Sequence, residues 1–415
     1  MRERRWRTFS ASCQDTWQEE TGAEMDVRSL LKVMVDQKAS DLYLTVDSAP
    51  TYRVHGSTQQ TNAPPFTNEQ LEALALALMR GQQRGEFEEK MEMNLALYYK
   101  ELGRFRVNVF RQRGNVGLVF RHIKAEIQTV DQLGLPPIVR DISMTKRGLV
   151  LVVGATGSGK STTLAAMIDH RNTTHPGHIV TVEDPIEFVH NHKRSLITQR
   201  EVGFDTLSFQ NALKNTLRQA PDVILIGEIR DTETMEAAIT FAETGHLCIG
   251  TLHSNNANQA IERIMNFFPV ERHAQIYLQL SLNLRAIISQ RLVPSVDGKR
   301  APALEIMLDT PRIKDLIKKA EVDSLKEAME QGVEEGCQTF DHVLFQLYKE
   351  ERISLEQALI NADSANNLRL KIKIEGLRGD DAVNALLDKK SGDPTTGAFK
   401  IQGGASGNVT PLRKR

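Results

Sequence analysis

The segment GATGSGKS, at Gly154–Ser161, constrains the fold of this chain more than any other sequence feature. It matches the phosphate-binding pattern G-x-x-x-x-G-K-[ST], in which glycines let consecutive backbone N–H groups converge on phosphate oxygens. An aliphatic run (LVLVV) precedes it and a helix-compatible run (STTLAAMID) follows it. The predicted nucleotide-binding residues are Gly154, Ala155, Thr156, Gly157, Ser158, Gly159, Lys160, Ser161 and Thr162.

The chemistry of such a loop assigns different tasks to its last residues. Lys160 is expected to reach the β- and γ-phosphates of ATP, and the Ser161 hydroxyl is expected to bind Mg²⁺. The N-terminus of the following helix adds partial positive charge at the same place. The competing interpretation is a glycine-rich turn with an idle lysine. It is weakened by the strand-like and helix-like flanks.

After this loop, strand-like and helix-like segments alternate. That alternation predicts an α/β core with a mostly parallel sheet and helices on both faces. Beyond Asn256 we expect mostly helices, out to about Leu387. The expected strands are Gly148–Val153, Ile179–Glu183, Val223–Ile226 and Leu247–Leu252, and the expected helices begin at Ser161, Ser208 and Thr232.

The residues before the core predict a separate α+β domain. A helical period begins at Met25, and a second one covers Asn68–Arg80. Strand-like pieces are Asp41–Val46, Thr51–Val54, Leu95–Tyr99, Arg104–Phe110 and Val116–Arg121. The predicted organisation is an extension or mobile arm at 1–24, the α+β domain at 25–123, a linker at 124–147, the ATPase core at 148–310, a helical C-terminal region at 311–388 and a disordered tail at 389–415.

Two apolar strands end in acidic residues. The segment HIVTVEDPIEF offers Glu183, Asp184 and Glu187, and DVILIGEIRD offers Glu228 and Asp231. Ligands of a doubly wound sheet bind at the carboxyl ends of its strands, where Glu183 and Glu228 are expected. We therefore predict that Glu183 and Glu228 hold the metal and orient water. Spacing alone leaves open which of the two activates water and which holds Mg²⁺ through its shell with Ser161.

A histidine and a group of arginines are further candidates. His253 ends another apolar strand, where an imidazole could sense the γ-phosphate. The alternative for His253 is a packed or surface side chain. The predicted strands GRFRVNVFRQRGNVGLVFR are rich in arginine. Such strands are usually a solvated face, and the alternative is that some arginines reach a phosphate on a neighbouring subunit and stabilise charge in phosphoryl transfer.

Composition excludes several classes of protein. Lys and Arg number 52 against 53 Asp and Glu, so the net charge of −1 argues against a general nucleic-acid binder. The three cysteines, Cys13, Cys248 and Cys337, form no C-x-x-C pattern, so neither a zinc site nor a disulfide framework is expected. No apolar run approaches the ~20 residues that span a bilayer, and no apolar segment follows the basic start. We expect a cytoplasmic protein.

Four ordered blocks, GATGSGKS, VEDPIEF, DVILIGEIRD and GHLCIGTLHSNNA, resemble the secretion ATPase superfamily that powers type II secretion and type IV pili. They look like its Walker A, Asp box, Walker B and His box, and the resemblance covers about Val27 to Leu370. It implies a RecA-like core, a PAS-like N-terminal domain and a hexameric ring with ATP between subunits. It also implies contacts in trans from N-terminal arginines, for which Arg106, Arg113 and Arg121 are the candidates.

Within that superfamily the chain resembles the pilus retraction branch. It has neither the extra N-terminal domain nor the four-cysteine site of assembly and secretion members. The resemblance implies a motor at the inner-membrane base of the pilus that retracts it and drives twitching motility, with the main retraction ATPase and the membrane platform protein as partners. The segment TPRIKDLIKKAEV lies where the main retraction ATPase has a more regular helix of the AIRNLIRE type, and here that motif is degenerate. The chain could therefore instead be a weakly active accessory ring partner. A type II secretion pseudopilus motor and a nucleic-acid translocase also stay open.

Overall fold

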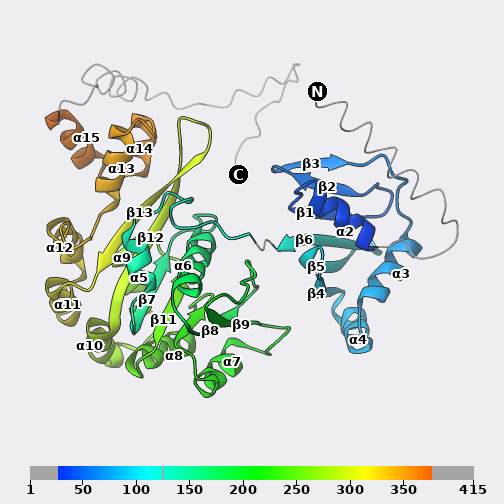
Figure 1. Cartoon of the computed structure of the whole chain (residues 1–415), viewed down its shortest axis with the longest axis horizontal. Helices are drawn as coiled ribbons and strands as arrows, with labels where there is room; N and C mark the ends of the chain where they lie inside the picture. The colour runs from blue at the N-terminus through cyan, green and yellow to red at the C-terminus, as the bar shows by residue number, and fades with distance from the viewer. Residues whose placement is uncertain (1–26, 124–125, 376–415) are drawn as a thin grey trace, which may run out of the picture.

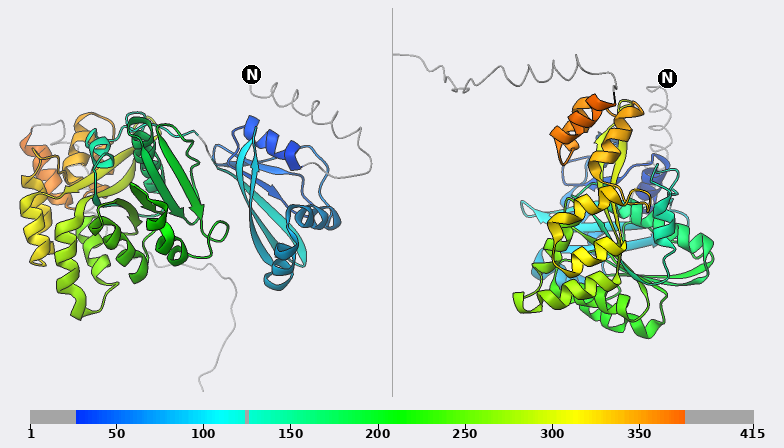
Figure 2. Two further views of the ribbon diagram at one scale, coloured as in Figure 1. Left: turned by 60° about the horizontal axis from the view of Figure 1, so that its bottom comes forward. Right: turned by 90° about the vertical axis from the view of Figure 1, so that its left-hand side faces the viewer.

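The computed structural model describes residues 27–123 and 126–375, which form two sheets with their covering helices (Figure 1). In Figure 1 and in the left view of Figure 2, the blue-to-cyan N-terminal sheet lies beside the core, on the side away from the orange C-terminal helices. The predictions for 1–24, for 389–415 and for helices as far as Leu387 concern residues outside the described ranges. None of the described helices is long and apolar enough to cross a membrane.

The N-terminal sheet of the described chain is antiparallel, with six strands in the order β3-β2-β1-β6-β5-β4. Its strands alternate apolar and polar residues, as in β5, where Phe105, Val107 and Val109 are buried and face the helices. The elements are α2 (Val27–Asp36), β1 (Asp41–Leu44), β2 (Thr51–Val54), β3 (Ser57–Gln60), α3 (Asn68–Leu78), α4 (Gly81–Lys90), β4 (Glu92–Tyr99), β5 (Gly103–Gln112) and β6 (Asn115–Ile123).

Two elements of this domain were not predicted. Strand β3 (STQQ) is polar and largely exposed at the sheet edge, and helix α4 buries only Phe87. Neither one carries a hydrophobic period, because neither contributes much to the core. The α+β character of the domain is as predicted, and its PAS-like description stays a prediction.

The core sheet has seven strands among the described residues, in the order β13-β12-β7-β11-β10-β8-β9. All pairs are parallel except β12 with β13, so the prediction of a mostly parallel sheet is confirmed. The strands are β7 (Gly148–Val153), β8 (Gly177–Glu183), β9 (Ser195–Glu201), β10 (Val223–Ile226), β11 (Leu247–Leu252), β12 (Leu284–Pro294) and β13 (Arg300–Leu308).

Both faces of this sheet are covered. Along β7, Leu149 and Leu151 pack with the helices α7 to α12, whereas Val150 and Val152 pack with α5 and α6. A strand buried on both faces reads as a continuous apolar run, which explains the segment GLVLVV. These helices are α5 (Ile138–Ser143), α6 (Lys160–Thr174), α7 (Phe209–Thr216), α8 (Thr232–Glu243), α9 (Ala257–Met265), α10 (His273–Asn283), α11 (Pro311–Lys318) and α12 (Leu325–Gln331).

The prediction of mostly helices beyond Asn256 was wrong for Leu284–Leu308. There β12 and β13 form a long antiparallel hairpin that extends the core sheet. Strand β12 is buried along most of its length, so its apolar run lacks the alternation that separates a strand from a buried helix. Beyond the hairpin, helices do follow: α13 (Phe340–Lys349), α14 (Leu355–Asn361) and α15 (Ala365–Ile374) pack on the hairpin end through Val293, Ala301 and Ala303.

The strand order places the predicted site. Strands β7, β11, β10 and β8 are parallel neighbours, so their carboxyl ends share one edge of the sheet. The glycine-rich loop follows β7, Glu183 ends β8, and Glu228 and His253 follow β10 and β11.

Candidate active site

The glycine-rich loop joins β7 to α6, and its backbone conformation requires glycine. Gly154 and Gly159 have φ of 153° and 91°, in the left-handed region that side chains rarely adopt. A Cβ on Gly154 would lie 2.5 Å from Ser158 Oγ and 2.6 Å from Gln290 O. A Cβ on Gly159 would lie 2.8 Å from Gln290 Nε2. The loop is therefore a close-packed backbone cradle, with Ala155, Thr156 and Gly157 exposed.

The polar groups of the loop fit a phosphate ligand. Lys160 begins α6, and its Nζ donates to the Gly154 carbonyl at 2.7 Å and to the Ala155 carbonyl at 3.0 Å. Burial lowers the pKa of Lys160, while Glu228 and Glu187 oppose that shift. Ser158 Oγ is buried without a hydrogen-bond partner among the described residues. Donors held in this way can serve the oxygens of a bound phosphate.

Glu228 and His253 meet at the same sheet edge. Glu228 follows β10 after Gly227, and His253 directly follows β11. His253 Nε2 and Glu228 Oε1 are 3.4 Å apart, and their side chains are 42% and 36% exposed. The backbone between the two strands is fixed, because Ile229 N donates to Thr251 O at 2.8 Å. The two predicted residues thus form a half-exposed pair that can still meet a ligand.

Glu183 ends β8 and is more enclosed. Its Oε1 accepts hydrogen bonds from Thr181 Oγ1 at 2.7 Å and from Gln199 Nε2 at 3.2 Å. Burial raises the pKa of Glu183, and those hydrogen bonds oppose the shift. A Cβ on Gly227 would lie 3.0 Å from the Glu183 Cα, so the Glu228 segment passes directly against this strand end.

The other acids offered by the two segments have different surroundings. Asp231 caps α8, because its Oδ1 accepts from Thr234 N at 2.9 Å. Asp184 is exposed and lies 4.0 Å from Arg230, and Glu187 is also exposed. Asp231 is thus occupied as a helix cap, whereas Glu187 is exposed and, like Glu228, interacts with the charge of Lys160. The assignment of Glu183 and Glu228 as the acids of the site stays a prediction.

Comparison with known proteins identifies the family of the chain. The family model for type II/IV secretion system proteins matches residues 18–368. The chain belongs to the type II/IV secretion ATPase family. It is 50% identical to the type IV pilus ATPase PilU of Pseudomonas aeruginosa, over 91% of this chain and 100% of PilU. It is 44% identical to the type IV pilus retraction ATPase PilT of the same organism, over 83% of this chain and 100% of PilT.

A solved structure extends the likeness to the fold. A crystal structure of the pilus retraction motor PilT with bound ADP matches with a TM-score of 0.78 and 41% identity. The match covers 83% of this chain and 99% of that one. The α/β fold expected for a secretion ATPase is therefore confirmed, and the sequence resemblance that suggested the family was correct.

The arginines expected to act in this secretion ATPase lie at different places. Arg106 is on β5, half-buried. Arg121 is on β6, where its Nε donates to the buried Asp41 at 2.8 Å. Arg113 was predicted on a strand, which was wrong, because it lies in the tight turn between β5 and β6 with a φ of 51°. Contacts in trans remain a prediction for all three.

Two features of the site were missed by sequence reasoning. Gln290 on β12 contacts the glycine-rich loop, and Thr163 Oγ1 donates to its Oε1 at 2.7 Å. Arg104 on β5 pairs with the buried Glu201 on β9 at 2.7 Å and so links the two sheets. No sequence pattern could have indicated Gln290, because the strand that carries it was not predicted. Arg104 could have been found, because it belongs to the arginine-rich strands described above.

Among residues 27–123 and 126–375, no group of three or more His, Cys, Asp or Glu side chains is arranged to hold a metal ion by itself.

Proposed function

We propose that this chain is a cytoplasmic Mg²⁺-dependent ATPase that powers type IV pilus retraction. The observation that carries the proposal is the packed glycine-rich loop beside the Glu228–His253 pair. Its likeness to PilU and PilT along most of its length supports the retraction role. ADP in the PilT structure supports an adenine nucleotide as the ligand.

The residues divide the chemistry among them. Residues 154–162 bind ATP, with Lys160 against its β- and γ-phosphates. Ser161 would hold Mg²⁺ and Glu228 would act through its shell, and a bound Mg²⁺ would supply neutralisation of the phosphate charge. Glu228 and Glu183 orient water and metal, and the half-exposed Glu228 is the better candidate to contact water because the hydrogen bonds to Glu183 Oε1 already use acceptor capacity. His253 meets the γ-phosphate.

Hydrolysis becomes mechanical work in a ring. We propose a homo-hexamer in which Arg106, Arg113 or Arg121 of one subunit faces the nucleotide of its neighbour. The start of the predicted linker at 124–147 would then act as the hinge, because its later residues Val130, Leu135, Val139 and Ile142 are packed in the core. Acting at the inner-membrane base of the pilus, such a ring would turn the platform protein and drive twitching motility.

A second candidate is a weakly active accessory partner of the main retraction ATPase. The 50% identity to PilU, together with the degenerate segment around α11, favours it. ATP turnover of the purified chain, measured alone and with its paralogous motor, separates the two. Substantial turnover alone supports an independent motor, and turnover that requires the paralogue supports the accessory role.

The retraction role itself is tested in cells. Deleting the gene should reduce pilus retraction and twitching, and restoring the wild-type chain should recover both. Retraction at the wild-type level in a strain that lacks both this chain and its paralogue would contradict the proposal.

A further inference from the structure

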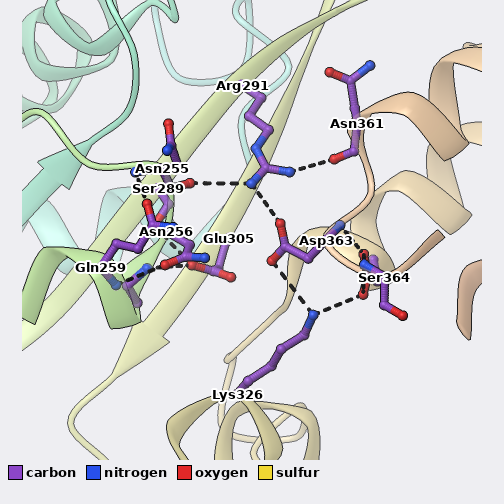
Figure 3. A network of polar contacts seen from close by, with 12 residues as sticks. Asn255, Asn256, Gln259, Ser289, Arg291, Glu305, Lys326, Asn361, Asp363 and Ser364 are labelled. Carbon is purple, nitrogen blue, oxygen red and sulfur yellow. Dashed lines mark hydrogen bonds and ion pairs between the residues drawn. The ribbon is translucent and has the colours of Figure 1, made fainter. Parts of the chain in front are cut away.

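Arg291 on β12 connects the C-terminal helices to the segment that follows His253 (Figure 3). Its Nη2 pairs with Asp363 Oδ1 at 2.7 Å and donates to the Asn255 carbonyl at 3.4 Å. Its Nη1 donates to the Asn361 carbonyl, and its guanidinium lies 3.8 Å from the Phe340 ring centroid. One planar cation therefore contacts α13, the α14–α15 connection and the segment after β11.

Asp363 is itself fixed in place. Its backbone N–H donates to Asp341 Oδ1 at 2.8 Å, and Lys326 Nζ lies 3.0 Å from Asp341 Oδ2 and 3.7 Å from Asp363 Oδ2. The charges alternate from Arg291 through Asp363 and Lys326 to Asp341. A network in which every member is paired holds its parts in one arrangement.

The same segment is held at a second point. Glu305 on β13 is 1% exposed and accepts hydrogen bonds from Ala257 N at 2.8 Å and from Ser289 Oγ at 3.0 Å. Residues 255 and 257 are thus held from two strands of the hairpin. His253, two residues before Asn255, projects from the start of a segment whose far end has little freedom.

The neighbour of Arg291 on β12 contacts the glycine-rich loop. Gln290 accepts from Thr163 Oγ1, and its carbonyl oxygen lies beside Gly154. Consecutive side chains of a strand point to opposite faces, so Gln290 and Arg291 reach the loop and the C-terminal helices respectively. An open cleft of about 560 Å³ borders Arg291, Lys326 and Asp363 and leaves this network accessible from outside.

We propose that Arg291, held by Asp363, is a positioning residue that couples the C-terminal helices to the placement of His253. The inference rests on the proposed ATPase function. Displacing α13 to α15 would break the hydrogen bond from the Arg291 guanidinium to the Asn255 carbonyl. The segment after His253 would then be held only by the hydrogen bond from Ala257 N to Glu305 among the contacts described above. The C-terminal region then sets the turnover rate without contacting ATP.

Asp363→Asn tests the coupling in the full-length protein. It removes the charge that holds Arg291 but keeps the shape of the side chain, and Lys326 retains Asp341. We expect kcat for ATP to fall about 3- to 10-fold, with the Kd for ATP changed by less than about 2-fold. Backbone amides at 254–257 of the nucleotide-free protein should exchange hydrogen faster, and Arg291→Lys should lower kcat in the same way.

Lys349→Gln is the matched control, because it breaks the pair of Lys349 with Glu375 in the same helical region without contacting Asn255. It should leave kcat and the exchange at 254–257 unchanged. A lower melting temperature of Asp363→Asn with wild-type kcat and wild-type exchange would overturn the inference. Absence of turnover in the wild-type chain would instead contradict the proposed function, while the exchange result would still test the coupling.

Discussion

Two polar clusters on the same core differ in how far their side chains are exposed to solvent. The first cluster lies at the carboxyl ends of β7, β8, β10 and β11, which we call the nucleotide edge. There the side chains of Glu228 and His253 are 36% and 42% exposed, and Glu228 Oε1 and His253 Nε2 are 3.4 Å apart. The C-terminal network consists of Arg291, Asp363, Lys326, Asp341 and Glu305. In it, the side chain of Asp363 is 15% exposed and Glu305 is 1% exposed. Exposed groups remain available to a ligand, as we propose for Glu228 and His253, whereas groups that hold elements together are used by their protein partners.

This difference predicts two kinds of mutational effect. Removing a group at the nucleotide edge should lower turnover and leave folding almost unchanged. Removing a group from the C-terminal network should lower the free energy of unfolding, because its former partners lose their hydrogen bonds and ion pairs.

The largest effect is expected at Glu228. Glu228→Gln should lower ATP turnover about 10³-fold, because the amide cannot accept a proton or hold the metal shell as a carboxylate does. The matched control is Asp231→Asn on the same loop, which keeps the cap on α8 and should retain turnover within about 2-fold. Steady-state phosphate release checks both. Equal losses in the two variants would remove the distinction between catalytic and structural acids.

The next effect concerns stability and pH at Glu305. Burial raises the pKa of Glu305 to about 7 from an ordinary value of 4.5. The folded state therefore keeps a proton that the unfolded state releases, and this carboxyl makes stability fall as pH rises from 4.5 to 7. Its share of the fall is about 3 kcal/mol.

Glu305→Gln removes that titration and keeps an amide oxygen for Ala257 N and Ser289. Denaturant unfolding at pH 4.5 and pH 8 should show the variant gaining about 3 kcal/mol relative to wild type across this interval. A constant difference between the two proteins across the pH range would show that Glu305 titrates normally.

The smallest effect is expected at the cap of α8. Asp231→Ala removes the acceptor for Thr234 N and should cost about 1 kcal/mol in the free energy of unfolding. Turnover measured well below the melting temperature should stay close to that of wild type. A large loss of turnover in Asp231→Ala with unchanged stability would place Asp231 among the catalytic groups instead.

The core strands could be predicted because they are short apolar runs with clear ends. Val223–Ile226 and Leu247–Leu252 match β10 and β11 residue for residue, since each strand is buried on both faces and ends at polar or glycine residues. The same burial hid β12, where an apolar run of strand length also fits a helix. Periodicity therefore located the nucleotide edge but not the hairpin beside it.

The C-terminal network could not be predicted for the same reason. Arg291 and Glu305 meet Asn255 and Asp363 only because the hairpin brings distant segments together. The nucleotide edge needed no such knowledge, because each of its residues follows its own strand and parallel strands end on one side. The sequence motifs thus predicted the positions of Lys160, Glu183, Glu228 and His253 at one edge of the sheet.

Phosphate release from ATP by the purified full-length chain, beside Lys160→Ala, tests the central claim most directly. The claim is that the glycine-rich loop and the acids beside it cleave ATP. Wild type, assayed with Mg²⁺ and if needed with a hydrolysis-deficient form of its paralogue, should release phosphate. Lys160→Ala should release it at least about 10³-fold more slowly, since alanine lacks the cation that we propose to meet the β- and γ-phosphates. Turnover of Lys160→Ala near the wild-type rate would contradict the account.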